Sequence, residues 1–228
     1  METLPRETIV DTLEGRLCDA ILAGHHAVGA MLPSERQLAD GYGVTRTTLK
    51  HAFERLTQAG LLETRHGVGT RVKDFVRLGG ADLLPMLVRH NSDWVGEIFE
   101  VRRSIGTLIA ERAAIRATPA DRSNLAALLS AVQAAAGGDA VQLADAELHR
   151  ALAHATGNRV YTLLTNTLFN AYLPVRAALV APFRDPQAAH DRVAPVVDAV
   201  LVGDPIVART AADAYLTTTE QIMLEGLG

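Results

Sequence analysis

Two adjoining stretches, LPSERQLA (residues 32–39) and GVTRTTL (residues 43–49), decide the fold of the first part of this chain. Ser34 can cap a first helix, and Gln37, three residues later, completes the spacing of a capping box. The glycine that opens the second stretch permits a sharp turn, and Thr45 can cap a second helix. The pattern predicts two short helices joined by a tight turn.

The second of these helices has an apolar face and a polar N-terminal end. Its apolar residues recur close to the helical period: Leu49, Ala52, Phe53 and Leu56. Its exposed N-terminal end carries Arg46, Thr47, Thr48 and Lys50. In a helix-turn-helix, this end faces base edges and phosphates in the major groove of DNA. We therefore expect these four residues to contact DNA; a packed helical hairpin without DNA contacts is the alternative.

A predicted β-hairpin follows the helix pair at once. Residues 61–64 and 70–73 are expected to form strands around the glycine-rich turn at 65–69. A helix-turn-helix followed by a hairpin with a basic tip is a winged helix. Local signals that agree in this way favour DNA binding over the packed hairpin.

These motifs resemble the DNA-binding domain of the GntR family of bacterial transcription regulators, over about residues 6–75. The resemblance implies a dimer on a near-palindromic operator. It implies that Arg36, Arg46, Thr47 and Lys50 read or clamp the major groove. At the wing, Arg65 is expected to contact DNA, and the resemblance places His66 and Gly67 in the minor groove. Lys50 stands where many relatives carry Arg, and Lys cannot make the same forked contact to guanine.

Composition narrows the class of protein further. The chain has 228 residues, a net charge of −4 and one cysteine, so an intrachain disulfide and a cysteine-based zinc cluster are excluded. The excess of basic residues between Ser34 and Lys73 makes that segment locally positive, as phosphate contact requires. No leader and no apolar run of membrane-spanning length is recognised, so we expect a soluble cytoplasmic protein that does not associate with membranes.

The expected fold is mostly α, in two domains. Residues 1–75 are predicted to form the winged helix-turn-helix, residues 76–82 a linker, and residues 83–228 an all-helical bundle for effector binding and dimerisation. Beyond the linker, the chain becomes rich in Ala and Leu, with helix caps and almost no strand pattern. The helices of this bundle are expected near residues 83–90, 92–117, 118–136, 140–156, 158–179, 187–202 and 205–224.

One pair of residues in the helical domain could bind a ligand or a metal. Asp145 and His149 are four residues apart and so share one helix face; an ion pair without further function is the alternative. The segment DAELHRALAHATGN is similar to the effector domain of one large GntR subfamily, in which two later histidines complete a metal site. Those two positions are Val193 and Tyr215 here. We therefore expect no resident metal. Asp145 and His149 are weak candidate metal ligands, and a second alternative is that His190 replaces one of the missing histidines.

The loss of the metal histidines resembles the fatty-acid-responsive FadR branch, which implies a long-chain acyl-coenzyme A as effector. A small carboxylate metabolite, sensed with a metal in the helical domain, is the alternative. Arg102 could meet a carboxylate or phosphate or could instead form an ion pair with Asp145. The candidate effector-binding residues are Arg102, Asp145, His149, Tyr215 and Thr219.

The predicted function is that of a ligand-responsive, DNA-binding regulator of a metabolic operon, without enzymatic activity. A metal-dependent enzyme in the helical domain is the alternative from another class. The sequence contains no Gly-x-Ser-x-Gly motif, phosphate-binding loop or dinucleotide fingerprint in its support.

Overall fold

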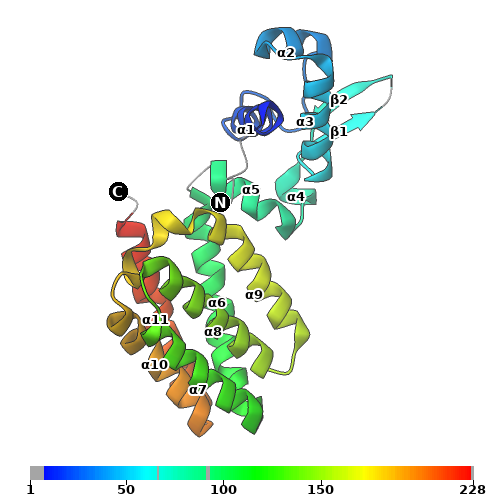
Figure 1. The fold of residues 1–228 in the computed structure, drawn as a ribbon. Helices are drawn as coiled ribbons and strands as arrows, with labels where there is room; N and C mark the ends of the chain where they lie inside the picture. The colour runs from blue at the N-terminus through cyan, green and yellow to red at the C-terminus, as the bar shows by residue number, and fades with distance from the viewer. Residues whose placement is uncertain (1–7, 66, 91–92, 227–228) are drawn as a thin grey trace. The chain divides into compact units, whose positions relative to one another are not determined.

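The computed structural model describes residues 8–65, 67–90 and 93–226, which form two compact units (Figure 1). The first unit lies within residues 1–91 and the second within residues 92–228. Each unit has its own hydrophobic core, and the fold is mostly helical, as the sequence predicts. No helix in the described part of the chain is both long enough and apolar enough to cross a membrane.

The first unit is a winged helix-turn-helix. Its elements are α1 (Ile9–Leu22), α2 (Glu35–Tyr42), α3 (Arg46–Gln58), β1 (Leu62–Arg65), β2 (Gly69–Val72), α4 (Phe75–Leu78), the 3₁₀ turn η1 (Ala81–Leu83) and α5 (Leu84–His90). Helix α3 packs on α1, α2 and β1 through Leu49, Phe53 and Leu56, which are almost completely buried. The two strands pair antiparallel, with Leu62 opposite Val72. This packing confirms the expected helix pair and wing.

The boundary between the units differs from the expected division. The expected linker at 76–82 is largely helical, since α4 and η1 occupy most of it, and α5 groups with the first unit rather than with the second. Helix α5 buries Met86, Leu87 and Val88 and packs on α1. His90 Nδ1 lies 2.8 Å from Asp19 Oδ1, which ties the end of α5 to α1. The apolar residues of α5 find their partners on α1, which the helical period alone could not indicate.

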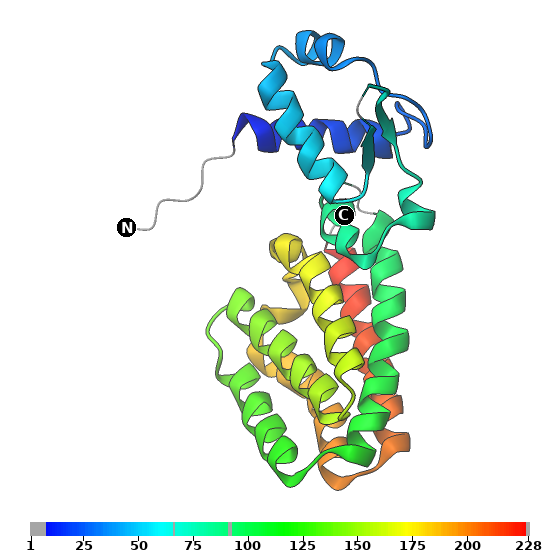
Figure 2. The ribbon, with the colours of Figure 1, turned by 90° about the vertical axis from the view of Figure 1, so that its right-hand side faces the viewer.

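In its described residues, the second unit is a bundle of six α-helices with two 3₁₀ segments. Its elements are α6 (Asp93–Arg116), α7 (Pro119–Ala134), α8 (Gly138–Ala155), α9 (Arg159–Tyr172), η2 (Leu173–Leu179), η3 (Ala181–Phe183), α10 (Pro186–Val202) and α11 (Pro205–Glu225). Helix α6 packs on α8, α9, α10 and α11 (Figures 1 and 2). The expected helix at 158–179 ends earlier as an α-helix, at Tyr172, since Pro174 has no N–H with which to continue the pattern.

Candidate functional site

The first candidate site is the N-terminal end of α3, which local caps hold in place. Ser34 and Gln37 form the predicted capping box: the Gln37 N–H donates to Ser34 Oγ over 3.3 Å, and the Ser34 N–H donates to Gln37 Oε1 over 3.0 Å. Gly43 ends α2 with a φ of 67°, which is costly for other residues. Thr45 then accepts the Thr48 N–H over 3.1 Å and starts α3. These caps fix where the first turn of α3 points.

The cations at this end are exposed and only weakly engaged within the chain. The side chains of Arg36, Arg46 and Lys50 are 82%, 69% and 65% exposed. Their carboxylate neighbours lie 3.9–4.0 Å away, and exposed pairs at that distance contribute little free energy. Thr47 is exposed, whereas the Thr48 hydroxyl lies 2.9 Å from Thr45 Oγ1. Arg36, Arg46, Thr47 and Lys50 are therefore free to meet DNA, and Thr48 also stabilises the helix start.

The wing carries two arginines that a single carboxylate orients. Glu63 accepts from Arg65 Nε over 3.0 Å and from Arg71 Nε over 2.6 Å. Hydrogen bonds from Arg65 and then Arg71 lower the pKa of Glu63, so this carboxylate is charged. The sequence did not single out Glu63 or Arg71. The strand register is what indicates this contact, because it places Glu63 directly opposite Arg71. His66, predicted at the wing tip, lies outside the described residues.

Gly67 at the wing tip has a φ of 75° and open space around its Cα. We expect Gly67→Val to strain the turn by about 1–2 kcal/mol, because a branched side chain disfavours this backbone region. Because the strained turn would displace the wing tip from the DNA, operator binding should weaken about tenfold. Fluorescence anisotropy measures this affinity.

Gly24→Val is the matched control for the wing variant, since Gly24 has a φ of 77° and open space but lies outside the wing. It should carry a similar strain and leave operator affinity unchanged. Unchanged affinity in the Gly67 variant, with an unchanged circular dichroism spectrum and melting temperature, would mean that the wing does not contact DNA.

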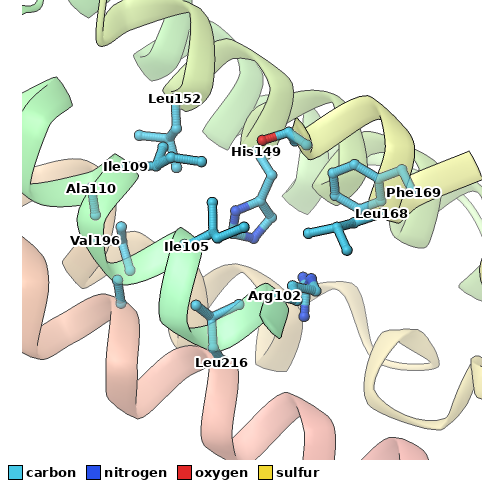
Figure 3. A pocket seen from close by; sticks show the side chains of 13 residues that line it. Arg102, Ile105, Ile109, Ala110, His149, Leu152, Leu168, Phe169, Val196 and Leu216 are labelled. Atoms are coloured by element: carbon cyan, nitrogen blue, oxygen red, sulfur yellow. The ribbon is translucent and has the colours of Figure 1, made fainter. Parts of the chain in front are cut away.

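The second candidate site is a small cavity inside the helical unit (Figure 3). Its volume is about 30 Å³, roughly the share of liquid volume that one water molecule takes. Five helices line it with Arg102, Ile105, Gly106, Ile109, Ala110, His149, Leu152, Thr165, Leu168, Phe169, Val196, Ala212 and Leu216. Gly106 lets α6 approach α11 closely, because a Cβ at this position would lie 2.6 Å from Leu216 Cδ1. The cavity therefore has mainly apolar walls and a polar end at Arg102 and His149.

A buried polar cluster lies at that end of the cavity. Tyr215 OH donates to Asp145 Oδ1 over 2.6 Å, although the two residues are far apart in the sequence. His149 Nε2 lies 3.8 Å from Asp145 Oδ2. The expected alternative, an ion pair between Arg102 and Asp145, is not formed among the described residues; the Arg102 guanidinium instead lies over the rings of Phe169 and Tyr172 at 5.9 and 6.0 Å. The fold thus brings four predicted effector residues together: Arg102, Asp145, His149 and Tyr215.

Several buried polar atoms near this cluster have no hydrogen-bond partner within the described part of the chain. They are Arg102 Nη2, Asp145 Oδ2, His149 Nε2 and Tyr172 OH; Thr219 Oγ1, four residues after Tyr215 on α11, is likewise unpartnered. Buried polar atoms in native proteins are almost always hydrogen-bonded to protein, water or a ligand. The sequence missed Tyr172, because the aromatic residue that ends α9 carried no motif. The cluster therefore offers both hydrogen-bond donors and hydrogen-bond acceptors to a bound molecule.

The cluster contains one permanent cation and one neutral imidazole. Burial lowers the pKa of His149 to about 4, an effect that Asp145 opposes and Arg102 reinforces. Burial also acts to lower the pKa of Arg102, but neighbouring Tyr172, Tyr215 and Asp145 outweigh it and raise that pKa. Burial raises the pKa of Tyr215, so its phenol stays protonated and can donate to Asp145. At neutral pH, Arg102 is therefore the cation that can bind an anionic group.

The residues present do not fit a metal site. Asp145 and His149 are the two donors on α8, while the other two positions that the resemblance implies hold the buried Val193 and the phenol of Tyr215. His190, the potential replacement, places its Nδ1 3.0 Å from Asp191 Oδ1 on its own helix. Within the described ranges, no group of three or more His, Cys, Asp or Glu side chains gathers around a common point. Asp145 Oδ1 is already occupied by the Tyr215 phenol.

Sequence comparison matches both units to known domains. The model of the bacterial regulatory proteins of the gntR family matches residues 9–72, and that of the FCD domain matches residues 97–218. The chain belongs to the GntR family. This GntR-family chain is 36% identical to the HTH-type transcriptional regulator Rv0494 of Mycobacterium tuberculosis, over 96% of this chain and 91% of that protein. It is 34% identical to the fatty acid metabolism regulator protein of Serratia proteamaculans, over 71% of this chain and 68% of that protein.

Solved structures with lower sequence identity support the fold of this GntR regulator. Lar of Listeria monocytogenes has a TM-score of 0.61 at 15% identity, covering 97% of this chain and 99% of that chain. McbR/YncC of E. coli has a TM-score of 0.53 at 17% identity, with coverage of 97% and 99%. Together with the caps and the wing, the family match identifies the chain as a DNA-binding transcription regulator of the FadR-like branch.

Proposed function

We propose that this GntR regulator binds a palindromic operator as a homodimer and that a ligand in the helical unit controls this binding. One winged helix offers a single recognition helix and so reads one half-site, and a two-fold operator calls for a two-fold protein. The observation that carries the ligand proposal is the set of unpartnered buried polar atoms at the end of an apolar cavity, with Arg102 among them. A bound molecule would satisfy those atoms.

The leading candidate for this ligand is a long-chain acyl-coenzyme A. Relatives named as fatty acid metabolism regulators support it, as do the apolar walls that the cavity presents beyond Arg102. A cavity of about 30 Å³ is too small for an acyl chain, since pockets for ligands of drug size have about 300–1,000 Å³. Binding therefore requires the helices around the cavity to separate. The ligand would then bind the conformation with separated helices better than the closed one. This difference in affinity would shift the protein toward the separated conformation and so control DNA binding.

A small carboxylate is the second candidate, and the cavity volume favours it. Such a ligand would need far less expansion, and Arg102 could bind its carboxylate through the unpartnered Nη2. The two candidate ligands would contact different parts of the cavity. An acyl chain would contact the apolar walls extensively, whereas a small carboxylate would contact mainly the polar cluster.

We further propose that ligand binding needs no resident metal and involves no catalytic step. A carboxylate and one imidazole would leave a divalent ion mostly coordinated by water and weakly held. Chelation should therefore leave the melting temperature and operator affinity of the purified protein unchanged. Stoichiometric zinc or nickel by elemental analysis, together with a melting temperature that falls sharply on chelation, would contradict this.

The experiment that tests the effector uses DNA fragments selected by the purified full-length protein. We expect oleoyl-coenzyme A to release the selected fragment in an anisotropy titration and free coenzyme A to have no effect. Release by carboxylates of two to six carbons, with oleoyl-coenzyme A inert, would favour the small-ligand candidate instead. Arg102→Met should weaken the response to either ligand and leave DNA binding without ligand intact, because Arg102 lies in the helical unit.

A further inference from the structure

The outer face of the wing gathers two arginines around one carboxylate. Leu62 and Val72 of the hairpin are buried in the core of the first unit, and successive side chains of a strand point to opposite faces. Glu63, Arg65 and Arg71 therefore lie together on the other, outer face of the hairpin (Figure 1). Their side chains are 31%, 62% and 46% exposed, so the two arginines are accessible to a bound molecule.

Each arginine is held by two contacts to its own oxygen of this carboxylate. Arg65 Nε donates to Glu63 Oε1 over 3.0 Å, and Arg65 Nη2 lies 2.9 Å from the same oxygen. Arg71 Nε donates to Glu63 Oε2 over 2.6 Å, and Arg71 Nη2 lies 2.5 Å from it. The two guanidinium groups thus lie on either side of one carboxyl group. Paired contacts of this kind fix the direction of a guanidinium as well as its position.

The carboxylates beside the recognition helix make weaker contacts. Asp40 lies 4.0 Å from Arg36, and Glu54 lies 3.9 Å from Lys50, which is beyond the distance of a hydrogen bond. Arg36 and Lys50 can therefore turn toward the phosphates of any DNA sequence. The wing arginines, in contrast, have a fixed direction, and one negative charge cancels half of their two positive charges.

We propose that Glu63 is a specificity-determining residue of the wing, because it positions Arg65 and Arg71 to contact phosphates only where α3 also lies in register on the operator. Arg65 ends β1 two positions before Gly67 of the turn, so a wing that contacts DNA brings both guanidinium groups to the backbone. A mobile arginine reaches the nearest phosphate of any sequence, whereas a fixed one matches a single register. The halved charge also weakens attraction that is independent of sequence.

The inference assigns a DNA contact to Arg71 and a positioning role to an acid whose own charge is repelled by phosphate. It rests on the operator binding of the proposed function and is independent of the effector. A carboxylate that served only to neutralise two neighbouring cations would change the affinity for all DNA alike. The ratio of operator affinity to random-DNA affinity therefore distinguishes the two roles.

Two matched substitutions separate the position of the arginines from the charge of the acid. Glu63→Gln and Asp40→Asn each remove one negative charge at almost constant shape. The amide in Glu63→Gln keeps one acceptor oxygen and turns an NH2 group toward the other guanidinium, which releases one arginine. We expect random-DNA affinity to rise about fivefold with operator affinity unchanged, so that the ratio falls about fivefold. In Asp40→Asn both affinities should rise by the same factor, about twofold.

The measurement is an anisotropy titration of the full-length protein on the selected operator and on random DNA, from about 50 to 200 mM salt. In Glu63→Gln, the dependence of log affinity on log salt for random DNA should steepen by about one, since the released arginine adds a phosphate contact. Melting should be unchanged, because the substituted group lies on the outer face. A ratio that does not fall in Glu63→Gln, or that falls equally in Asp40→Asn, would overturn the proposal.

A background without the two arginines tests whether Glu63 acts through them. When Arg65→Gln and Arg71→Gln are combined, Glu63 has no guanidinium to hold. Adding Glu63→Gln should then raise both affinities alike and leave the ratio unchanged. A fall of the ratio in this background as well would show that Glu63 acts independently of the arginines, and would overturn the proposal. A wild type that binds the selected fragment no better than random DNA would instead refute the operator binding of the proposed function.

Discussion

Replacing Arg46 with Ala is expected to lower operator affinity by about 1–3 kcal/mol, or roughly 5- to 150-fold, and to relax base preference at one base pair in each half-site. Arg46 is the first residue of α3, directly after the Thr45 cap, and its side chain is 69% exposed. From this place a guanidinium can donate two hydrogen bonds to guanine in the major groove. The 3.9 Å contact with Glu35 is too long and too exposed to hold it back.

The measurement is a binding titration on the selected operator, on operators with single base changes and on random DNA. Arg16→Ala provides the matched control, because Arg16 is an exposed arginine of the same unit that lies on α1 and not on the recognition helix. We expect the control to change affinity for all DNAs equally and only slightly. If Arg46→Ala lost the same affinity on the operator and on random DNA, Arg46 would contribute charge but no base discrimination.

Acidification is expected to destabilise the helical unit through His149. Burial lowers the pKa of His149 to about 4, whereas an unfolded chain has a histidine pKa of about 6.5. Between these values, the unfolded state binds more protons, so the free energy of unfolding falls as the pH falls. The contribution is fully present above pH 6.5 and is lost toward pH 4. Its size is about 3 kcal/mol, from about 1.4 kcal/mol for each pKa unit.

The test compares urea unfolding of wild type and His149→Gln at pH 7 and at pH 4.5. The variant should lose less stability on acidification than the wild type, because its amide does not titrate. His154→Gln is the control on the same helix, since the His154 side chain is 77% exposed, and it should behave as the wild type does. Identical acid sensitivity in wild type and His149→Gln would show that His149 is not held neutral by burial.

Most of the first unit could be predicted from the sequence, because its signals are local. Ser34 with Gln37 and Thr45 with Thr48 satisfy backbone groups within three residues, so their spacing alone indicates the helix starts. The wing could be recognised from alternating residues around glycine for the same reason. The role of Glu63 could not, since it depends on which residues lie opposite in the hairpin.

The candidate effector site was predictable only in part. The spacing of Asp145 and His149 predicted that both lie on one face of a helix. Val193 and Tyr215 occupy the two positions at which the resemblance implies metal-binding histidines. Whether Asp145 would accept a hydrogen bond from Tyr215, 70 positions away in the sequence, depends on how α8 and α11 pack. The small cavity volume likewise depends on the close approach of α6 to α11 at Gly106.

The sequence by itself determined the winged helix-turn-helix, its capped recognition helix and the helical class of the second unit. Capping, turn formation and hydrophobic period act over a few residues, and so they are written directly in the order of the chain. The tertiary structure alone decided that α5 belongs to the first unit, that Arg102 lies over Phe169 and Tyr172, and that Val160 and Leu163 of α9 are left exposed. These outcomes depend on which apolar surfaces of distant helices bury one another, and that choice follows from the packing of the whole unit.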